Sequence, residues 1–180
     1  GVDTGRIRIA SFFSVAVSWL PWILREFRRD YPNVDVQIIE GGADEVESLV
    51  LGREADLCIY TGREGRGFDW YPLYRDPLLA VVPPDHPLAR AERFPVAELE
   101  GAEFILPRAG FDVDIHQVLE KAGCNPKIKF TSCNDYAIMS MVAAGLGVSI
   151  LSKLILDSFP CEAVALPMEP AFSRILGMGV

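Results

Sequence analysis

The first third of the chain alternates between two hydrophobic periods, and this alternation constrains the fold more than any other feature. Residues 6–10 (RIRIA) alternate polar and apolar side chains, as strands do, and residues 12–27 then repeat apolar side chains at helical spacing. The pattern continues with a strand at 34–39 (VDVQII), a helix at about 43–52 and a strand at 55–60. Strands joined by helices in this order form right-handed crossovers, so the sequence predicts an α/β fold with a parallel sheet.

Two residues shape the first predicted helix. Ser11 directly precedes it, where a serine is a favourable N-cap. Pro21 lies within it and is expected to kink or restart it, because proline lacks a backbone donor.

The rest of the chain repeats the strand and helix patterns. The segment 61–67 (TGREGRG) is expected to be a flexible loop, and 83–87 (PPDHP) is a rigid break that marks a lobe boundary. We expect strands at 68–74, 78–82, 103–106, 127–130, 148–151, 164–166 and 174–178, and helices at 96–100, 112–122, 135–144 and 152–158.

Composition and charge exclude several classes of protein. The 180 residues are half apolar and 23% charged, which is enough to bury a core. Seventeen basic and 25 acidic residues give a net charge of −8, which argues against binding nucleic acid or an anionic membrane through overall charge. The apolar runs are shorter than the roughly 20 residues that span a bilayer, and the polar residues 1–5 show no signal peptide.

The sequence contains no recognisable metal or cofactor motif. Its four cysteines form no CxxC pair and only two histidines are present, so we expect no metal ion, no cofactor and free thiols in a reducing cytoplasm. Cys58 lies in an apolar run and is predicted to be buried in a strand. No nucleophile elbow, zinc-protease or phosphate-loop motif occurs.

Polar residues and glycines follow several predicted strands, where parallel sheets bind ligands. The helices that begin there offer free backbone donors to an anion, and Arg108 adds a guanidinium suited to a carboxylate or oxyanion. Helix capping alone also explains Ser11 and Asn134, and a solvated loop explains Arg108. The candidate ligand-binding residues at these strand ends are Ser11, Gly42, Thr61, Arg108, Ser132 and Asn134.

The chain resembles the effector-binding domain of LysR-type transcriptional regulators. The order and spacing of the matching motifs make the set specific over nearly the whole chain. The motifs are RIRIAS at 6–11, LP at 20–21, YPNV at 31–34, EADL at 54–57, DPL at 76–78, PDHPLA at 84–89, ELEG at 98–101 and MVAAGLGV at 141–148.

This resemblance implies two Rossmann-like lobes, as in type 2 periplasmic binding proteins, with the effector in the cleft between them. The first lobe would be 1–78 plus 171–180, and the second 79–170. The resemblance adds Ala43 and Phe111 to the expected effector contacts, and Phe12 would narrow the cleft toward a small ligand.

The resemblance also implies the partners of the domain. The effector is expected to be a small anionic molecule in the cytoplasm. The domain is expected to form a homodimer or homotetramer through the exposed side of the helix at 19–27. The winged helix-turn-helix that precedes this domain in the family is absent from this chain, so DNA and RNA polymerase would be partners of the full-length protein only. The segment Gly42-Ala43 lacks the hydroxyl that the family often has there, so its contact would be through the backbone.

Two alternatives share this fold. A periplasmic-type solute-binding protein is disfavoured by the short length, the lack of a signal peptide and the unpaired cysteines. An enzyme would depend on Arg108, Asp112, Asp114 and His116, although the dipole at a helix start explains the two acids. We therefore expect a sensor rather than an enzyme.

Overall fold

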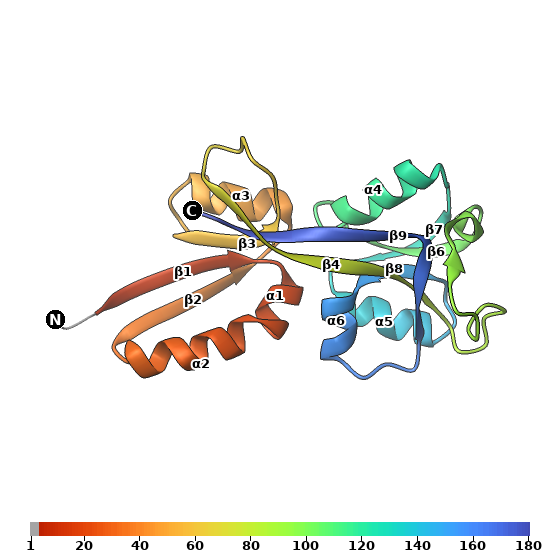
Figure 1. The fold of residues 1–180 in the computed structure, drawn as a ribbon, viewed down its shortest axis with the longest axis horizontal. Helices are drawn as coiled ribbons and strands as arrows, with labels where there is room; N and C mark the ends of the chain where they lie inside the picture. The colour runs from red at the N-terminus through yellow and green to blue at the C-terminus, as the bar shows by residue number, and fades with distance from the viewer. Residues whose placement is uncertain (1–3) are drawn as a thin grey trace. The chain divides into compact units, whose positions relative to one another are not determined.

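The computed structural model describes residues 4–180, so residues 1–3, which begin the first predicted lobe, lie outside the described residues. The chain divides into two compact units. Unit 1 comprises the described residues up to Arg75 together with Ile175–Val180, and unit 2 comprises Asp76–Arg174. Two long strands, β4 (Trp70–Val82) and β9 (Val164–Gly179), each contain residues of both units (Figure 1).

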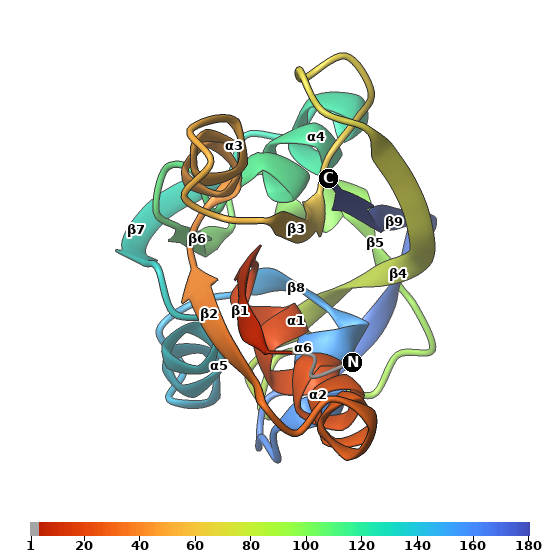
Figure 2. The same ribbon diagram turned by 90° about the vertical axis from the view of Figure 1, so that its left-hand side faces the viewer.

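Unit 1 is built on a parallel sheet, as the alternating periods predict. The central strand β1 pairs in parallel with β2 on one side and with β3 on the other, and the end of β9 adds an antiparallel strand beside β3. Helix α3 covers one face of this sheet, and α2 lies on the other (Figures 1 and 2). The elements are β1 (Gly5–Ser11), α1 (Phe13–Ser18), α2 (Leu20–Asp30), β2 (Val34–Glu40), α3 (Ala43–Leu51) and β3 (Leu57–Thr61).

The predicted helix restart is confirmed, but the predicted N-cap is wrong. Helix α1 ends at Ser18 and α2 begins at Leu20, which places Pro21 in the first turn, where a missing backbone donor costs little. Ser11 is instead the last residue of β1, and Phe12 occupies the N-cap position without a side-chain hydrogen bond. The backbone remains extended for one residue longer than the serine suggested.

Unit 2 contains a second set of strands and helices. Strand β6 pairs in parallel with β7, and residues 78–81 of β4 pair antiparallel with β8. Phe94, Leu99, Phe104, Ile150 and Met168 are almost fully buried in its core. The elements that unit 2 holds in full are β5 (Phe94–Pro95), a 3-10 turn (Val96–Leu99), β6 (Glu103–Pro107), α4 (Val113–Ala122), β7 (Lys127–Ser132), α5 (Asp135–Ala143), β8 (Ser149–Ser152) and α6 (Lys153–Ser158).

Two pairs of predicted strands are single strands in the structure. The segments 68–74 and 78–82 merge into β4, and 164–166 and 174–178 merge into β9. Both long strands contain prolines, which are typical of turns, but a strand tolerates proline where no ladder hydrogen bond is needed from that residue. The remaining predicted helices and strands are confirmed within two residues at each end.

Cys58 is fully buried in β3, as predicted, and burial raises its pKa to about 11. All four cysteines are free thiols, with Cys58 and Cys124 buried and Cys133 and Cys161 exposed. Within residues 4–180, no helix has both the length and the apolar character needed to cross a membrane.

Candidate functional site

The first group of predicted site residues lies at the carboxyl ends of the parallel strands of unit 1. Ser11 pairs in register with Glu40 of β2 and Ile59 of β3, so β1 and β2 end together and β3 continues for two more residues. The next residue, Phe12, donates its N–H to the Ile59 carbonyl at 3.2 Å, and Gly41 donates to the Ser11 carbonyl at 3.1 Å. The structure thereby brings together Ser11, Phe12, Gly42, Ala43 and Thr61 at one edge of the sheet.

The hydroxyl of Ser11 is the most unusual polar group at this edge. The residue is fully buried, and Oγ is the one buried side-chain polar atom without a hydrogen-bond partner among the described residues. A buried hydroxyl without a partner costs about 1–3 kcal/mol, so such groups are rare in folded proteins. The fold therefore holds a hydrogen-bonding group at the end of β1 that its own residues leave unsatisfied.

Buried Tyr60 packs against Phe12 at the same edge, a structural role that sequence reasoning missed. The ring of Phe12 meets the Tyr60 ring edge-on, with centroids 6.0 Å apart. The Tyr60 hydroxyl donates to Oε1 of Glu47 at 2.9 Å, and Arg66 Nε lies 3.4 Å from the same oxygen. Burial and this carboxylate raise the pKa of Tyr60, so the hydroxyl stays protonated and fixes β3 against α3.

The start of α3 offers backbone donors but no hydroxyl, as its sequence implies. Gly42 is the N-cap and makes no side-chain cap, and both Gly42 and Ala43 are buried. Asp44 and Glu45 occupy the first turn, where they already balance the helix dipole. The start of α3 is consequently unfavourable for the anionic group of a ligand.

The second group of predicted residues lies at the carboxyl ends of β6 and β7 in unit 2. Arg108 donates its backbone N–H to the Ser132 carbonyl at 2.9 Å, which joins the loops that follow the two strands. Ser132 Oγ accepts the Asn134 N–H at 3.2 Å, and Asn134 Oδ1 accepts the Ala137 N–H at 3.1 Å. Asn134 is thus the N-cap of α5. Capping is one of the two roles that the sequence allowed for this residue, the other being ligand binding.

Arg108 is exposed, and no described carboxylate pairs with it. Its guanidinium carbon lies 5.4 Å from the centroid of the Phe111 ring, and the Phe111 N–H donates to the Arg108 carbonyl at 2.9 Å. Stacking on an aromatic ring orients a guanidinium while leaving its edge donors available. The loop therefore presents a positioned cation.

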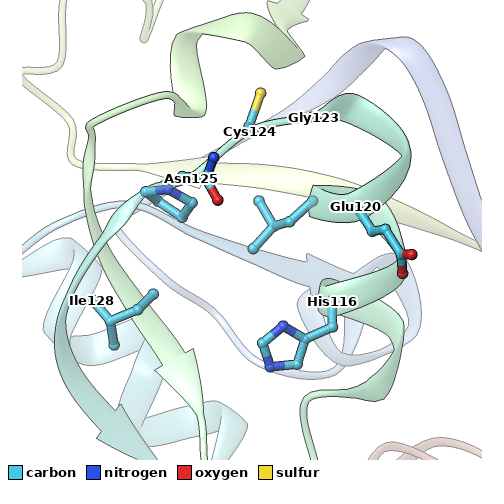
Figure 3. Close-up of a pocket in the computed structure, with 8 residues that line it drawn as sticks. His116, Glu120, Gly123, Cys124, Asn125 and Ile128 are labelled. Atoms are coloured by element: carbon cyan, nitrogen blue, oxygen red, sulfur yellow. The ribbon is translucent and has the colours of Figure 1, made fainter.

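The acid and histidine that an enzyme would use are engaged with each other on the surface of α4. His116 Nε2 lies 2.7 Å from Oδ2 of Asp112, and Asp112 Oδ1 accepts the Gly110 N–H. His116 also borders a surface hollow of about 550 Å³ between α4 and β7, together with Leu119, Glu120 and Ile128 (Figure 3). None of the nine predicted site residues lines this hollow. No group of three or more metal-ligating side chains is found within residues 4–180.

Comparison with known proteins identifies the family. The family described as "LysR substrate binding domain" matches residues 1–179. The probable HTH-type transcriptional regulator LrrA of Synechococcus elongatus is 32% identical over 182 residues, which cover 100% of this chain and 61% of LrrA. The uncharacterized regulator YybE of Bacillus subtilis is 28% identical over 84% of this chain and 53% of its own length. The chain thus spans between about half and three fifths of these curated relatives.

Solved structures share the fold at lower identity. The regulatory domain of Synechocystis PCC6803 CcmR, solved in complex with 2-PG, has a TM-score of 0.90 at 22% identity, covering 98% of this chain and 88% of that one. The effector-binding domain of QuiR, in complex with shikimate, has a TM-score of 0.87 at 19% identity, covering 98% and 87%. These similarities confirm the predicted two-lobed α/β fold class, and the match over residues 1–179 shows that this chain belongs to the LysR substrate-binding domain family.

Proposed function

We propose that this chain is the sensor domain of a transcriptional regulator and that it binds a small anionic effector. The observation that carries the proposal is the buried Ser11 hydroxyl, which has no partner among the described residues and lies where parallel strands end. A ligand atom that bonds to Oγ removes the cost of leaving this group unsatisfied. Phe12, Gly42, Ala43 and Thr61 complete the unit 1 contacts.

The anionic part of the effector is assigned to unit 2. Arg108 is positioned by Phe111 and has no carboxylate partner in the described part of the chain, whereas Asp44 and Glu45 make the start of α3 unfavourable for an anion. Ser132 and Asn134 add polar groups beside Arg108. The ligands in the two similar structures support a small molecule of this kind, since shikimate is a carboxylate.

We further propose that effector occupancy is read by a DNA-binding domain outside this chain. The curated relatives are HTH-type regulators and are longer than this chain, and its net charge of −8 disfavours direct DNA contact. In the full-length cytoplasmic protein, DNA and RNA polymerase are the expected macromolecular partners. The exposed Trp22 and Ile23 on α2 and Ile128 and Phe130 on β7 suit a homodimer or homotetramer.

Thermal unfolding with a panel of carboxylates, aromatic acids, amino acids and inorganic oxyanions tests the effector proposal. A ligand at one hundred times its dissociation constant adds about 2.7 kcal/mol. The midpoint is then expected to rise by at least about 2–4 °C, and the compound to be recovered unchanged. The control is a Ser11→Leu, Arg108→Ala variant, which removes the Ser11 hydroxyl and the Arg108 guanidinium. An equal shift in that variant, or conversion of the compound, contradicts the proposal.

A further inference from the structure

A buried ion pair joins the first and last residues of unit 2. Arg174 Nε lies 2.9 Å from Oδ2 of Asp76, and the two side chains are 9% and 0% exposed. Asp76 belongs to β4 and Arg174 to β9. Because unit 2 comprises Asp76–Arg174, the pair lies where both strands continue into unit 1.

The same two side chains also hold the start of α6. Arg174 Nη2 donates to Ser152 Oγ at 3.0 Å, and Ser152 Oγ accepts the Ile155 N–H as the N-cap of that helix. Asp76 Oδ1 accepts the Leu154 N–H at 3.2 Å. The ion pair is therefore continuous with the first turn of α6.

The two other helices that follow strands in unit 2 each carry an acid in their first turn that interacts with the same guanidinium, one by contact and the other through its charge. Asp114, in the first turn of α4, places Oδ2 3.8 Å from Arg174 Nη1. Asp135 is the first residue of α5; burial raises its pKa, and the charge of Arg174 partly offsets that shift. Arg174 thus contacts the N-terminal turns of α4 and α6, and its charge acts on that of α5.

These turns continue directly from the candidate ligand-binding loops of unit 2. Helix α4 begins two residues after Phe111, and Asp135 is the residue after Asn134. A displacement of either loop that carries the start of its helix therefore changes the position of an acid relative to Arg174.

We propose that Arg174 is a positioning residue of the effector site, which holds both ligand-binding loops of unit 2 in a fixed relation to β4 and β9. The role of the loops rests on the proposed function, whereas the ion cluster itself does not. An effector that moves either loop acts on this cluster, and through Asp76 and Arg174 on the strands that lead to unit 1. Neither residue needs to touch the effector.

Amide hydrogen exchange of the 180-residue chain without effector tests this role. The double variant Asp76→Leu, Arg174→Met removes both charges together, because a single change would leave a buried charge unpaired. We expect exchange in the double variant to accelerate at least tenfold more at amides in the loops and helix starts than at amides that pair within the sheet. The first group is Arg108, Ala137, Leu154 and Ile155, and the second is Ile105 and Val148.

Two further variants separate positioning from general stability. Leu119→Ala destabilises the core of unit 2 without altering any residue of the ion cluster and is expected to accelerate all these amides by similar factors. Arg174→Lys keeps the charge but not the fork of donors, so it is expected to preserve protection at Ala137 more than at Leu154 and Ile155. Uniform acceleration in the double variant overturns the proposal. If the double variant does not fold, Arg174→Lys decides instead. The proposal is then overturned if Arg174→Lys loses protection equally at the amides of Ala137, Leu154, Ile155 and Val148.

The measurement is independent of the effector. A negative result in hydrogen exchange contradicts the role of Arg174 but not effector binding. A negative ligand screen contradicts effector binding but not the role of Arg174.

Discussion

Tyr60 and Glu47 are joined by a 2.9 Å hydrogen bond from the tyrosine hydroxyl to Oε1, which fastens the end of β3 to the middle of α3. The Tyr60 ring lies 5.4 Å from that of Trp70 and 6.4 Å from that of Phe68, centroid to centroid. Together with Phe12, these rings form an aromatic cluster beneath the unit 1 part of the candidate site. Rigid support of this kind keeps a binding edge in place before the ligand arrives.

Gly177 allows β9 to pass this aromatic cluster. A Cβ at this position would lie about 2.5 Å from a carbon of the Trp70 ring and from the Tyr71 carbonyl oxygen. We expect Gly177→Ala to lower the free energy of unfolding by about 1–3 kcal/mol in urea titrations, since the backbone oxygen cannot move aside. It should also change the near-ultraviolet circular dichroism of the tryptophans.

The matched control is Gly145→Ala, whose Cβ meets nothing within 4 Å but whose φ of 85° is strained for alanine. It is expected to cost about 1–2 kcal/mol without the spectral change. Equal spectra for both variants would show that Trp70 adapts to the extra methyl group.

Replacing Ser11 is expected to separate stability from binding. Oγ has no partner among residues 4–180, so Ser11→Ala should leave the free energy of unfolding unchanged or raise it by up to about 1 kcal/mol, while weakening effector binding. Ser152→Ala is the matched comparison, because Ser152 caps α6 and accepts a bond from Arg174; it should cost about 2 kcal/mol. A loss above about 1 kcal/mol in Ser11→Ala would mean that the hydroxyl is satisfied in solution.

Arg108 is expected to carry the affinity for an anion. Loss of a charge-assisted hydrogen bond costs about 1.5–3 kcal/mol, so Arg108→Ala should weaken binding of the anion identified in the thermal screen roughly 10- to 150-fold by calorimetry. Arg90→Ala, an exposed arginine elsewhere in unit 2, should leave the dissociation constant unchanged. Equal effects of both changes would indicate general electrostatic attraction instead of a site.

Two aspartates are expected to change stability with pH in opposite directions. Hydrogen bonds from Arg8 lower the pKa of Asp56 below 3.8, so its contribution is present above about pH 4 and is lost as pH falls through the folded-state pKa. Because this pair is exposed, Asp56→Asn should cost only about 0.2–1 kcal/mol at pH 7.

Burial raises the pKa of Asp135, so its charged form is disfavoured in the folded state and stability falls as pH rises through the folded-state pKa. Asp135→Asn should therefore stabilise the protein at pH 7, with a gain that declines as pH approaches 4. Urea unfolding of both variants and the parent between pH 4 and 8 measures these differences. A destabilised Asp135→Asn at pH 7 would show that the attraction of Arg174 outweighs burial.

The order of the elements, the parallel sheet and the family could be predicted from the sequence. These predictions depend on residues only a few positions apart. They used the hydrophobic periods of 2 residues in strands and 3.6 in helices, the interruption at Pro21 and the capping group at Asn134. The same local reasoning was wrong at Ser11. A serine that precedes an apolar run can be either the N-cap of a helix or the last residue of a strand, and the local sequence does not distinguish the two. Local reasoning also divided β4 and β9 at their prolines.

The sequence by itself determined which strands and helices form and which strand ends bear polar groups. The tertiary structure alone decided the state of those groups: Ser11 Oγ without a partner among the described residues, Tyr60 bonded to Glu47, and Asp76 paired with Arg174 across 98 positions. Periodicity and capping act within a few residues of the chain. Hydrogen bonds and ion pairs between distant residues exist only once the strands that carry them have become neighbours and excluded water.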